Sequence, residues 1–249
     1  AGLQIPRHAF RRRRRQAPEE VSQVASSLAP AQLAVRVSEI FYSLQGESSR
    51  VGLPTVFIRL TGCPLRCTWC DTEYAFTGGN AQTIEEIVAE TSRYGTRTVC
   101  VTGGEPLAQK NCPPLLTALC DAGFDVSLET SGALDIGNVD PRVARIMDLK
   151  APGSGESDKN LWSNLEHLRA SDEIKIVLAN RADYEWARST INDHRLGDRC
   201  PVLLSPVQGT LTPATLADWI LADPLPAGRF PMRFQLQLHK VLWGNMRAK

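Results

Sequence analysis

Six short apolar segments, separated by stretches with helical periodicity, constrain the fold of this chain most strongly. They are residues 55–60, 98–102, 125–130, 145–150, 173–179 and 201–205. Their length and their content of Val, Ile and Leu predict buried strands. The intervening sequence predicts helices with clear start signals, since Thr83 is followed three residues later by Glu86 and Thr212 directly precedes Pro213.

Strands that alternate with helices favour a parallel sheet with right-handed crossovers. Six such units, rather than eight, predict an α/β fold of the partial (open) TIM-like barrel type. In such barrels functional residues gather at the carboxyl ends of the strands. The segments TGCPLRCTWCDT, TGGEP, ETSG, DLKAPGSG and LSPVQG follow the predicted strands and carry thiols, glycines and polar groups. This edge of the sheet therefore predicts an enzyme.

Residues 234–240, FQLQLHK, alternate in polarity and predict a last strand that ends at His239 and Lys240.

Composition narrows the class of protein. The 28 basic and 27 acidic residues give a formal charge of +1, and no segment approaches the roughly 20 apolar residues of a spanning helix. We therefore expect neither direct nucleic-acid binding nor membrane insertion. Residues 1–34 include five consecutive arginines, 11–15, without a following apolar run. We expect a disordered basic extension there, with a nucleic-acid interaction tail as the alternative, and one domain over residues 35–249.

Three of the seven cysteines form a compact group. Cys63, Cys67 and Cys70 follow one another at intervals of four and three positions, and no histidine lies near enough in sequence to complete a typical zinc site. The absence of a secretion signal predicts a cytoplasmic protein, in which clustered thiols indicate a metal or catalysis. A 4Fe-4S cluster on three cysteines leaves one iron without a protein ligand, so a small molecule can bind there. Zinc with a remote fourth ligand stays open as an alternative.

The sequence Cys63-Pro-Leu-Arg-Cys67-Thr-Trp-Cys70, followed by Gly103-Gly-Glu-Pro106, resembles the radical S-adenosylmethionine (SAM) superfamily. The segments FYSLQGES, TVFIRLTGCPLRCTWCDT, VTGGEP, DLKAPGSG and QLHKVLW together resemble the 7-carboxy-7-deazaguanine synthase family. They span residues 35 to about 245. The resemblance implies a radical SAM core, a 4Fe-4S cluster, SAM and Mg²⁺.

The resemblance also implies a role for individual residues. The cluster ligands are Cys63, Cys67 and Cys70. The SAM contacts are Trp69, Cys70, Asp71, Gly104, Glu105, Asp148, Leu149 and Lys150, with Ser205, Pro206, Val207 and Gln208 as a further segment. The pterin contacts are Leu44, Gln45, Gly46, Arg59 and Thr102, and the magnesium ligand is Thr72. No side chain is assigned as a catalytic group, because the chemistry belongs to the cluster and the cofactor.

Three of these residues have a physical rationale and a simpler alternative. The planar guanidinium of Arg59 could bind a substrate carboxylate through two hydrogen bonds, or form a surface ion pair. Glu105 could accept the methionine ammonium of SAM, or the GGEP segment could be a plain turn. The hydroxyl of Thr72 suits magnesium, although an isolated threonine is more often a cap.

The activity implied by the resemblance is that of a lyase. It converts 6-carboxy-5,6,7,8-tetrahydropterin to 7-carboxy-7-deazaguanine with loss of ammonia, in queuosine and 7-deazapurine biosynthesis. The implied partners are an electron donor such as flavodoxin or ferredoxin and a second copy in a homodimer. One alternative is an activase that uses the same cluster on a glycine of a protein substrate. The other is a zinc-stabilised nucleic-acid-binding module.

Overall fold

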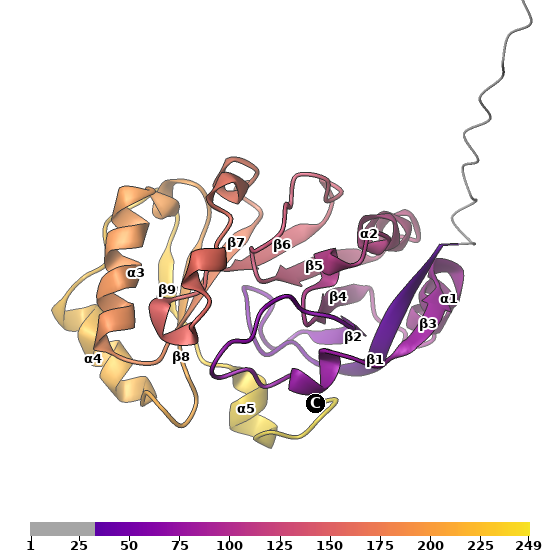
Figure 1. The fold of residues 1–249 in the computed structure, drawn as a ribbon, viewed down its shortest axis with the longest axis horizontal. Helices are drawn as coiled ribbons and strands as arrows, with labels where there is room; N and C mark the ends of the chain where they lie inside the picture. Colours follow the sequence, from indigo (N-terminus) through magenta and orange to yellow (C-terminus); the bar gives the residue numbers. More distant parts are fainter. Residues whose placement is uncertain (1–32) are drawn as a thin grey trace, which may run out of the picture.

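The computed structural model describes residues 33–249. Nine strands form one sheet in the order β3-β1-β2-β4-β5-β6-β7-β8-β9 (Figure 1). The strands are β1 (Ala34–Leu44), β2 (Pro54–Leu60), β3 (Asn80–Thr83), β4 (Thr98–Gly103), β5 (Asp125–Thr130), β6 (Ala144–Asp148), β7 (Glu173–Leu178), β8 (Val202–Pro206) and β9 (Met232–Phe234). The helices are α1 (Ile84–Ser92), α2 (Cys112–Asp121), α3 (Arg181–Asp193), α4 (Pro213–Ala222) and α5 (Leu238–Trp243).

All six predicted strands are present, and from β2 to β9 each neighbouring pair is parallel. The sheet does not close, so the predicted partial barrel is confirmed. Three strands were not predicted: β1, which pairs antiparallel with β2, β3, which pairs antiparallel with β1, and β9, which pairs parallel with β8. The expected basic extension, residues 1–34, lies outside the described residues except for its last two, and β1 begins at Ala34.

The helices begin where the capping residues predict. The side chain of Thr83 accepts a hydrogen bond from the backbone of Glu86, and the Glu86 side chain accepts one from the backbone of Thr83, which completes a capping box. At the start of α4 the Thr212 side chain accepts a hydrogen bond from the backbone N–H of Thr215, and Pro213 lies in the first turn. Each cap satisfies backbone donors that the first helical turn leaves free.

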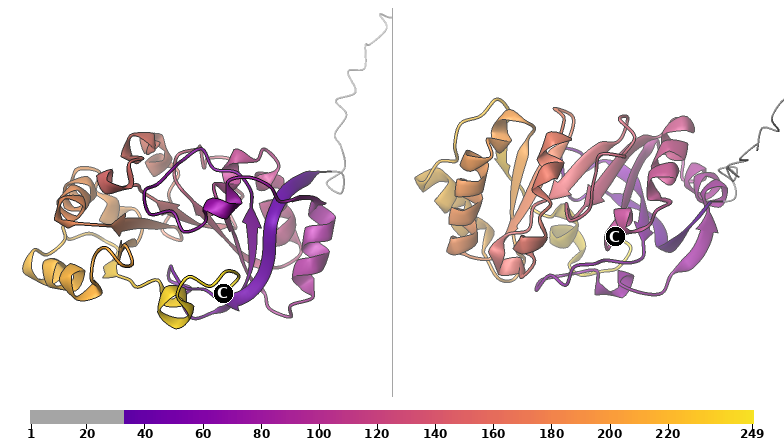
Figure 2. Two further views of the ribbon diagram at one scale, coloured as in Figure 1. Left: turned by 60° about the horizontal axis from the view of Figure 1, so that its bottom comes forward. Right: turned by 45° about the horizontal axis from the view of Figure 1, so that its top comes forward.

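One large apolar core lies between the sheet and the helices that cover its outer face. It includes Ile58 and Val101 from the strands, Leu115 and Leu119 from α2, and Tyr184 from α3, all fully buried. Figure 2 shows these helices along one side of the sheet. The opposite face of the sheet is therefore left to line an interior space.

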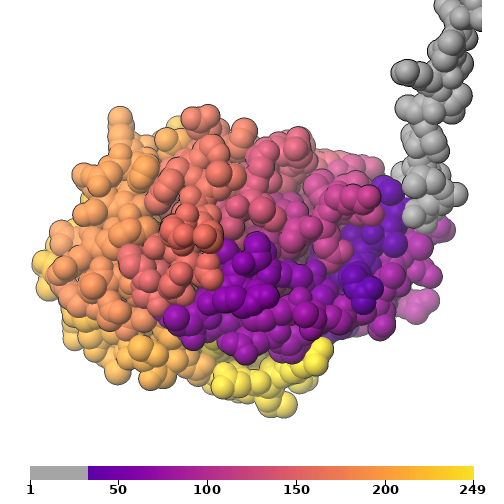
Figure 3. Space-filling view, viewed as in Figure 1, coloured from indigo at the N-terminus to yellow at the C-terminus, as the bar shows by residue number. Residues whose placement is uncertain are grey.

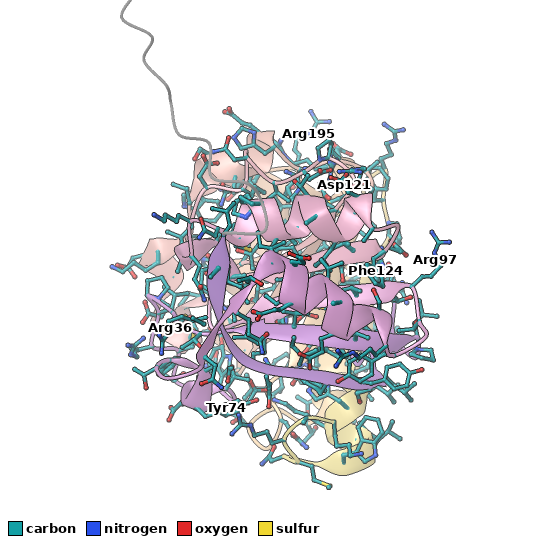
Figure 4. All side chains as sticks on the ribbon, turned by 90° about the vertical axis from the view of Figure 1, so that its right-hand side faces the viewer. Arg36, Tyr74, Arg97, Asp121, Phe124 and Arg195 are labelled. Atoms are coloured by element: carbon teal, nitrogen blue, oxygen red, sulfur yellow. The ribbon has the colours of Figure 1, made fainter. Side chains whose placement is uncertain are left out.

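The two ends of the strand layer differ in chemistry. In Figure 4, α1 and α2 lie across the front, with Arg97 and Phe124 towards one end and Arg36 and Tyr74 towards the other. Arg97 and Phe124 directly precede β4 and β5 and mark the amino ends of the strands. Tyr74 follows the cysteine segment at the carboxyl end.

Among residues 33–249, no helix is long and apolar enough to cross a membrane.

The C-terminal segment lies against residues from the start of the domain. In Figures 1 and 2, α5 and the chain end sit beside the β1–β2 region, and the space-filling view shows the two regions in contact (Figure 3). The backbone N–H of Leu238 donates to the carbonyl of Gly46 at 2.9 Å. Gln235 and Ser48 exchange two hydrogen bonds, with Ser48 N to Gln235 Oε1 at 2.8 Å and Gln235 Nε2 to Ser48 O at 2.7 Å.

This contact corrects one prediction from the sequence. The segment 234–240 is not a last strand: β9 ends at Phe234, and His239 and Lys240 lie in α5. The alternating polarity does not mark the two faces of a strand here, because the polar Gln235 turns inward to Ser48 while the apolar Leu236 stays partly exposed. His239 packs so closely on Gly46 that a Cβ at Gly46 would lie 2.1 Å from Nδ1 of the histidine.

Candidate active site

A cavity of about 970 Å³ opens at the carboxyl ends of the parallel strands. It is lined by the loop after β1, the cysteine segment, the ends of β4, β5 and β6, the turn after β8, and α5 with the residues that follow it. Most of the residues predicted for the site line it: Leu44, Gln45, Gly46, Arg59, Cys63, Cys67, Trp69, Cys70, Asp71, Thr72, Thr102, Gly104, Asp148, Lys150, Val207 and Gln208. Glu105, Leu149, Ser205 and Pro206 lie behind this surface.

The cysteine segment is fixed to the barrel on both sides. The Gly62 N–H donates to the carbonyl of Ala75 at 2.8 Å, and the Gly62 carbonyl accepts the N–H of Glu105 at 2.7 Å. Further along, the Thr68 N–H donates to the carbonyl of Ser154 at 3.0 Å. The three cysteines therefore reach the cavity from a loop whose backbone is already held.

The three thiols are free and partly exposed. Burial raises the pKa of Cys63 and of Cys67, which opposes formation of the thiolate in the empty protein. A bound metal centre reverses that preference, since thiolate is the form that ligates. The Sγ of Cys70 lies 3.8 Å from the hydroxyl of Thr72, so the two groups face the same part of the cavity.

The GGEP turn packs directly against the cysteine segment. Gly103 has φ +155°, and a Cβ on it would lie 2.3 Å from the carbonyl oxygen of Leu60. At Gly104 a Cβ would meet the carbonyl oxygen of Gly62 at 2.4 Å and the Cβ of Cys63 at 2.7 Å. Both positions thus require glycine because the two loops approach so closely.

Glu105 is fully buried, and its carboxylate is occupied by protein donors. It accepts hydrogen bonds from the N–H of Leu107 (2.9 Å), the hydroxyl of Thr130 (2.8 Å), and both the N–H (2.7 Å) and hydroxyl (2.5 Å) of Ser131. In this arrangement the side chain ties the GGEP turn to the end of β5. Its backbone, rather than its carboxylate, faces the cysteine segment.

The end of β6 brings charged groups to the cavity. Asp148 and Lys150 line it, and the Lys150 ammonium lies 3.1 Å from Oδ2 of Asp148. The intervening Leu149 points into the core and is 1% exposed. Oδ1 of Asp148 is buried without a hydrogen-bond partner in the structure, so it is free to accept one from a bound molecule.

The residues predicted to contact the pterin converge on Glu129 and on Glu39. The Gln45 amide donates to Oε1 of Glu129 (3.2 Å), and the Thr102 hydroxyl donates to Oε2 (2.9 Å). Arg59 is paired with Glu39, with Nε 2.8 Å from Oε1. Tyr74 also donates to this Glu39 oxygen, at 2.9 Å. The ion pair considered for Arg59 is therefore present, but it faces the cavity rather than the outer surface.

The remaining predicted residues lie at opposite walls of the cavity. Asp71 is paired with Lys240 of α5, Oδ2 to Nζ 2.7 Å. In the segment after β8, Val207 and Gln208 line the cavity, while Ser205 is fully buried with a hydroxyl that has no partner in the structure.

Several lining residues were not predicted, namely Glu47, Glu129, Lys175, Gln237, His239 and Lys240. Two carried a detectable signal. Lys175 interrupts the apolar run of residues 174–178 in β7, and Glu129 stands next to the carboxyl end of β5. Burial lowers the pKa of His239 and so favours its neutral form.

Comparison with known proteins agrees with the site that the geometry describes. The Radical SAM superfamily model matches residues 57–151. A 7-carboxy-7-deazaguanine synthase from Chlorobaculum tepidum is 47% identical over 213 residues, which cover 84% of this chain and 94% of the relative. The chain belongs to the 7-carboxy-7-deazaguanine synthase family.

Two further similarities agree with that family. A 7-carboxy-7-deazaguanine synthase from Koribacter versatilis is 41% identical, over 84% of this chain and 97% of the relative. The crystal structure of QueE from Escherichia coli superposes with a TM-score of 0.67 at 26% identity, over 83% of this chain and 95% of that one. A radical SAM enzyme, rather than a zinc-stabilised binding module, is therefore the class of this protein.

Radical SAM enzymes use a 4Fe-4S cluster and SAM, and the residues present fit both groups. Three free thiols from one anchored loop supply the sulfur ligands that a cluster needs. Beside them, the close approach at Gly104 and the free oxygen of Asp148 leave a polar surface for the second molecule. When bound, these two groups together supply a 5'-deoxyadenosyl radical.

Proposed function

We propose that this protein converts 6-carboxy-5,6,7,8-tetrahydropterin to 7-carboxy-7-deazaguanine, with contraction of the pterin ring and release of ammonia. The observation that carries the proposal is the meeting of two residue sets in one cavity. Cys63, Cys67 and Cys70 line one wall, and Gln45, Arg59 and Thr102 line another. The reaction is inferred from family membership, and this cavity provides space for the substrate and the cofactor together.

In this proposal the protein binds the substrate, orients it and shields the reacting atoms from water. Gln45 and Thr102, both held by Glu129, present an amide and a hydroxyl to the edge of the heterocycle. Arg59 offers the nitrogens that Glu39 does not occupy to the substrate carboxylate. The α5 segment, closed over Gly46, excludes water from the reacting atoms.

The SAM molecule would contact the GGEP turn through backbone groups at Gly104, and Asp148 and Lys150 at the end of β6. Trp69 and Asp71, on the cysteine segment, and Val207 and Gln208, after β8, would complete its surroundings. Glu105, Leu149, Ser205 and Pro206 would act from behind, by holding the backbone that makes these contacts. This division follows from which of the residues line the cavity.

Magnesium is proposed at Thr72. Its hydroxyl faces the cavity next to Cys70, so a cation there could also take oxygens from the substrate carboxylate. Magnesium binds through few protein oxygens plus substrate and water oxygens, which suits a single threonine. The ion would neutralise the carboxylate as the ring rearranges.

The wider setting is proposed from the family. We propose a cytoplasmic homodimer that receives electrons from a carrier such as flavodoxin or ferredoxin and whose product enters queuosine or other 7-deazapurine synthesis. The cysteines of the described chain are all unpaired, which fits a reducing compartment. We place catalysis in residues 35–249 and propose residues 1–34 as a basic extension, of which the last residue, Ala34, already belongs to β1.

Anaerobic reconstitution tests the proposal. The full chain is loaded with iron and sulfide and given reductant, SAM, magnesium and the carboxytetrahydropterin, and 7-carboxy-7-deazaguanine is measured by chromatography and mass spectrometry. We expect product in proportion to enzyme. Cleavage of SAM without the deazaguanine would refute the proposed substrate and favour the activase alternative. The cavity lined by Gln45, Arg59 and Thr102 favours a small molecule over a protein glycine.

A further inference from the structure

Lys175 is a buried cation at the centre of the cavity wall. It lies on β7, whose other residues are buried or nearly so, and its side chain is 13% exposed. A lysine in such a strand loses hydration and needs compensating partners. Both of its partners are carboxylates that line the cavity.

The two carboxylates come from different parts of the chain. Oε2 of Glu47 lies 2.5 Å from the Lys175 ammonium, and Oδ2 of Asp148 lies 3.3 Å from it. Glu47 directly follows Gln45 and Gly46, which the proposed function assigns to the pterin. Asp148 ends β6, which it assigns to SAM. One ammonium therefore joins the two binding regions.

Among the described residues, the contacts of Glu47 and Asp148 occupy every carboxylate oxygen of the two residues except Oδ1 of Asp148. Gln237 donates to Oε1 of Glu47 at 2.6 Å, and Lys150 lies 3.1 Å from the same Asp148 oxygen that Lys175 approaches. Both oxygens of Glu47 and Oδ2 of Asp148 are thus engaged, while Oδ1 of Asp148 has no hydrogen-bond partner among residues 33–249. The lysines hold Asp148 by one oxygen and direct the other to a hydrogen-bond donor on a bound molecule.

The charges of this network balance only while Lys175 is present. Glu47 and Asp148 contribute two negative charges, and Lys150 and Lys175 contribute two positive charges. Without Lys175, Glu47 would be a buried carboxylate with no cation within salt-bridge distance among the described residues. Such a group takes up a proton or moves towards water, and either change disturbs the loop that carries Gln45.

We propose that Lys175 is a positioning residue that couples the pterin-binding loop to the SAM-binding end of β6. The inference rests on the proposed function for the identity of the pterin, and it goes beyond that function by assigning Lys175, Glu47 and the free oxygen of Asp148. Lys175 contacts Glu47 and Asp148 through its ammonium. Its effect on both ligands passes through the two carboxylates.

The test compares Lys175→Met with Lys159→Met in the reconstituted full chain. Lys159 is an exposed lysine paired with Asp158, so its replacement controls for loss of one charge. SAM affinity is measured from the change that SAM causes in the electron paramagnetic resonance spectrum of the reduced cluster, and KM for the pterin is measured separately. We expect Lys175→Met to keep its iron content, weaken SAM binding at least ten-fold and raise KM for the pterin at least ten-fold. Lys175→Arg should recover part of both losses.

Single substitutions at the two carboxylates separate the effect on pterin binding from the effect on SAM binding. Glu47→Gln should raise mainly KM for the pterin, and Asp148→Asn should weaken mainly SAM binding; these variants decide the matter if Lys175→Met does not fold. Wild-type binding of both ligands by Lys175→Met, or a loss confined to one ligand, overturns the coupling. Absence of pterin turnover in the wild type would refute the proposed function instead, and the spectroscopic arm would still report whether Lys175 holds Asp148.

Discussion

Replacement of Glu105 by glutamine distinguishes a structural anchor from a direct SAM contact. The carboxylate is fully buried and accepts hydrogen bonds from Leu107, Thr130 and Ser131. A glutamine has nearly the same shape, but one oxygen becomes an NH₂ group that only donates. The hydroxyls of Thr130 and Ser131 can rotate to accept from this group. The two backbone N–H groups cannot rotate, and they bond to different oxygens of the carboxylate.

The magnitude follows from that geometry. One of the two backbone donors must lose its acceptor, which costs about 1–3 kcal/mol for a buried group, and the bonds that remain lose the roughly two-fold strengthening that the charge provides. We expect the free energy of unfolding to fall by about 3 kcal/mol. For a domain of this size that corresponds to a lower Tm by about 6–12 °C.

The assay is guanidinium or thermal unfolding of the cluster-free protein, followed by circular dichroism. Glu166→Gln, at an exposed position, is the matched control and should change the stability by less than about 0.5 kcal/mol. SAM affinity of the reconstituted variant is measured alongside. A stability equal to that of the wild type, together with loss of SAM binding, would show that Glu105 contacts SAM directly and would refute the anchor role.

Three further outcomes are expected. Arg59→Lys should raise KM for the pterin about ten-fold while SAM binding is unchanged, because an ammonium cannot bond to Glu39 and to a carboxylate in one plane; an unchanged KM would remove Arg59 from the substrate site. Thr72→Ala should keep the iron and the visible absorption but lose magnesium-dependent turnover, and persistence of that dependence would place the ion elsewhere. Burial raises the pKa of Glu47, but the attraction to Lys175 and the hydrogen bonds from Lys175 and Gln237 together outweigh it and lower the value from 4.5 to about 2. Its contribution to stability is therefore complete above about pH 4.5 and is lost as the pH falls towards 2. Glu47→Gln should flatten that part of the curve of unfolding free energy against pH, and an unaltered curve would contradict the ion pair.

The sequence predicted the parallel strands and the main helices because their evidence is local. Apolar runs such as 98–102 and caps such as Thr83 determine an element from a few neighbouring residues. Strand β1 was missed because the alternation that is clear at Val35 and Val37 breaks at residues 38–40, where the register with β2 shifts. The segment 234–240 was misassigned because its pattern reflects a contact of Gln235 with Ser48, far away in sequence.

The site was predicted in part, for the same reason. The cysteine spacing and GGEP are compact motifs, so the positions of Cys63 and Gly104 could be read from a short window. Glu47 and Lys175 are 128 residues apart, and each alone has the appearance of an ordinary surface charge or strand lysine. Their role depends on a pairing that only the folded chain creates.

The Ser48–Gln235 contact has a consequence for biogenesis. It joins residues separated by 187 positions, and closing so long a loop carries a large entropic cost that must be met before the contact forms. Contacts of this kind form slowly, and during synthesis the second partner leaves the ribosome long after the first. Cys63, Cys67 and Cys70, the proposed cluster ligands, have all been synthesised once residue 70 is added, whereas the wall built from Gln235 and α5 can close over them only later. Between those two events the thiols are open both to a cluster donor and to oxidants, so delivery of iron and sulfide competes with oxidation on the timescale of translation.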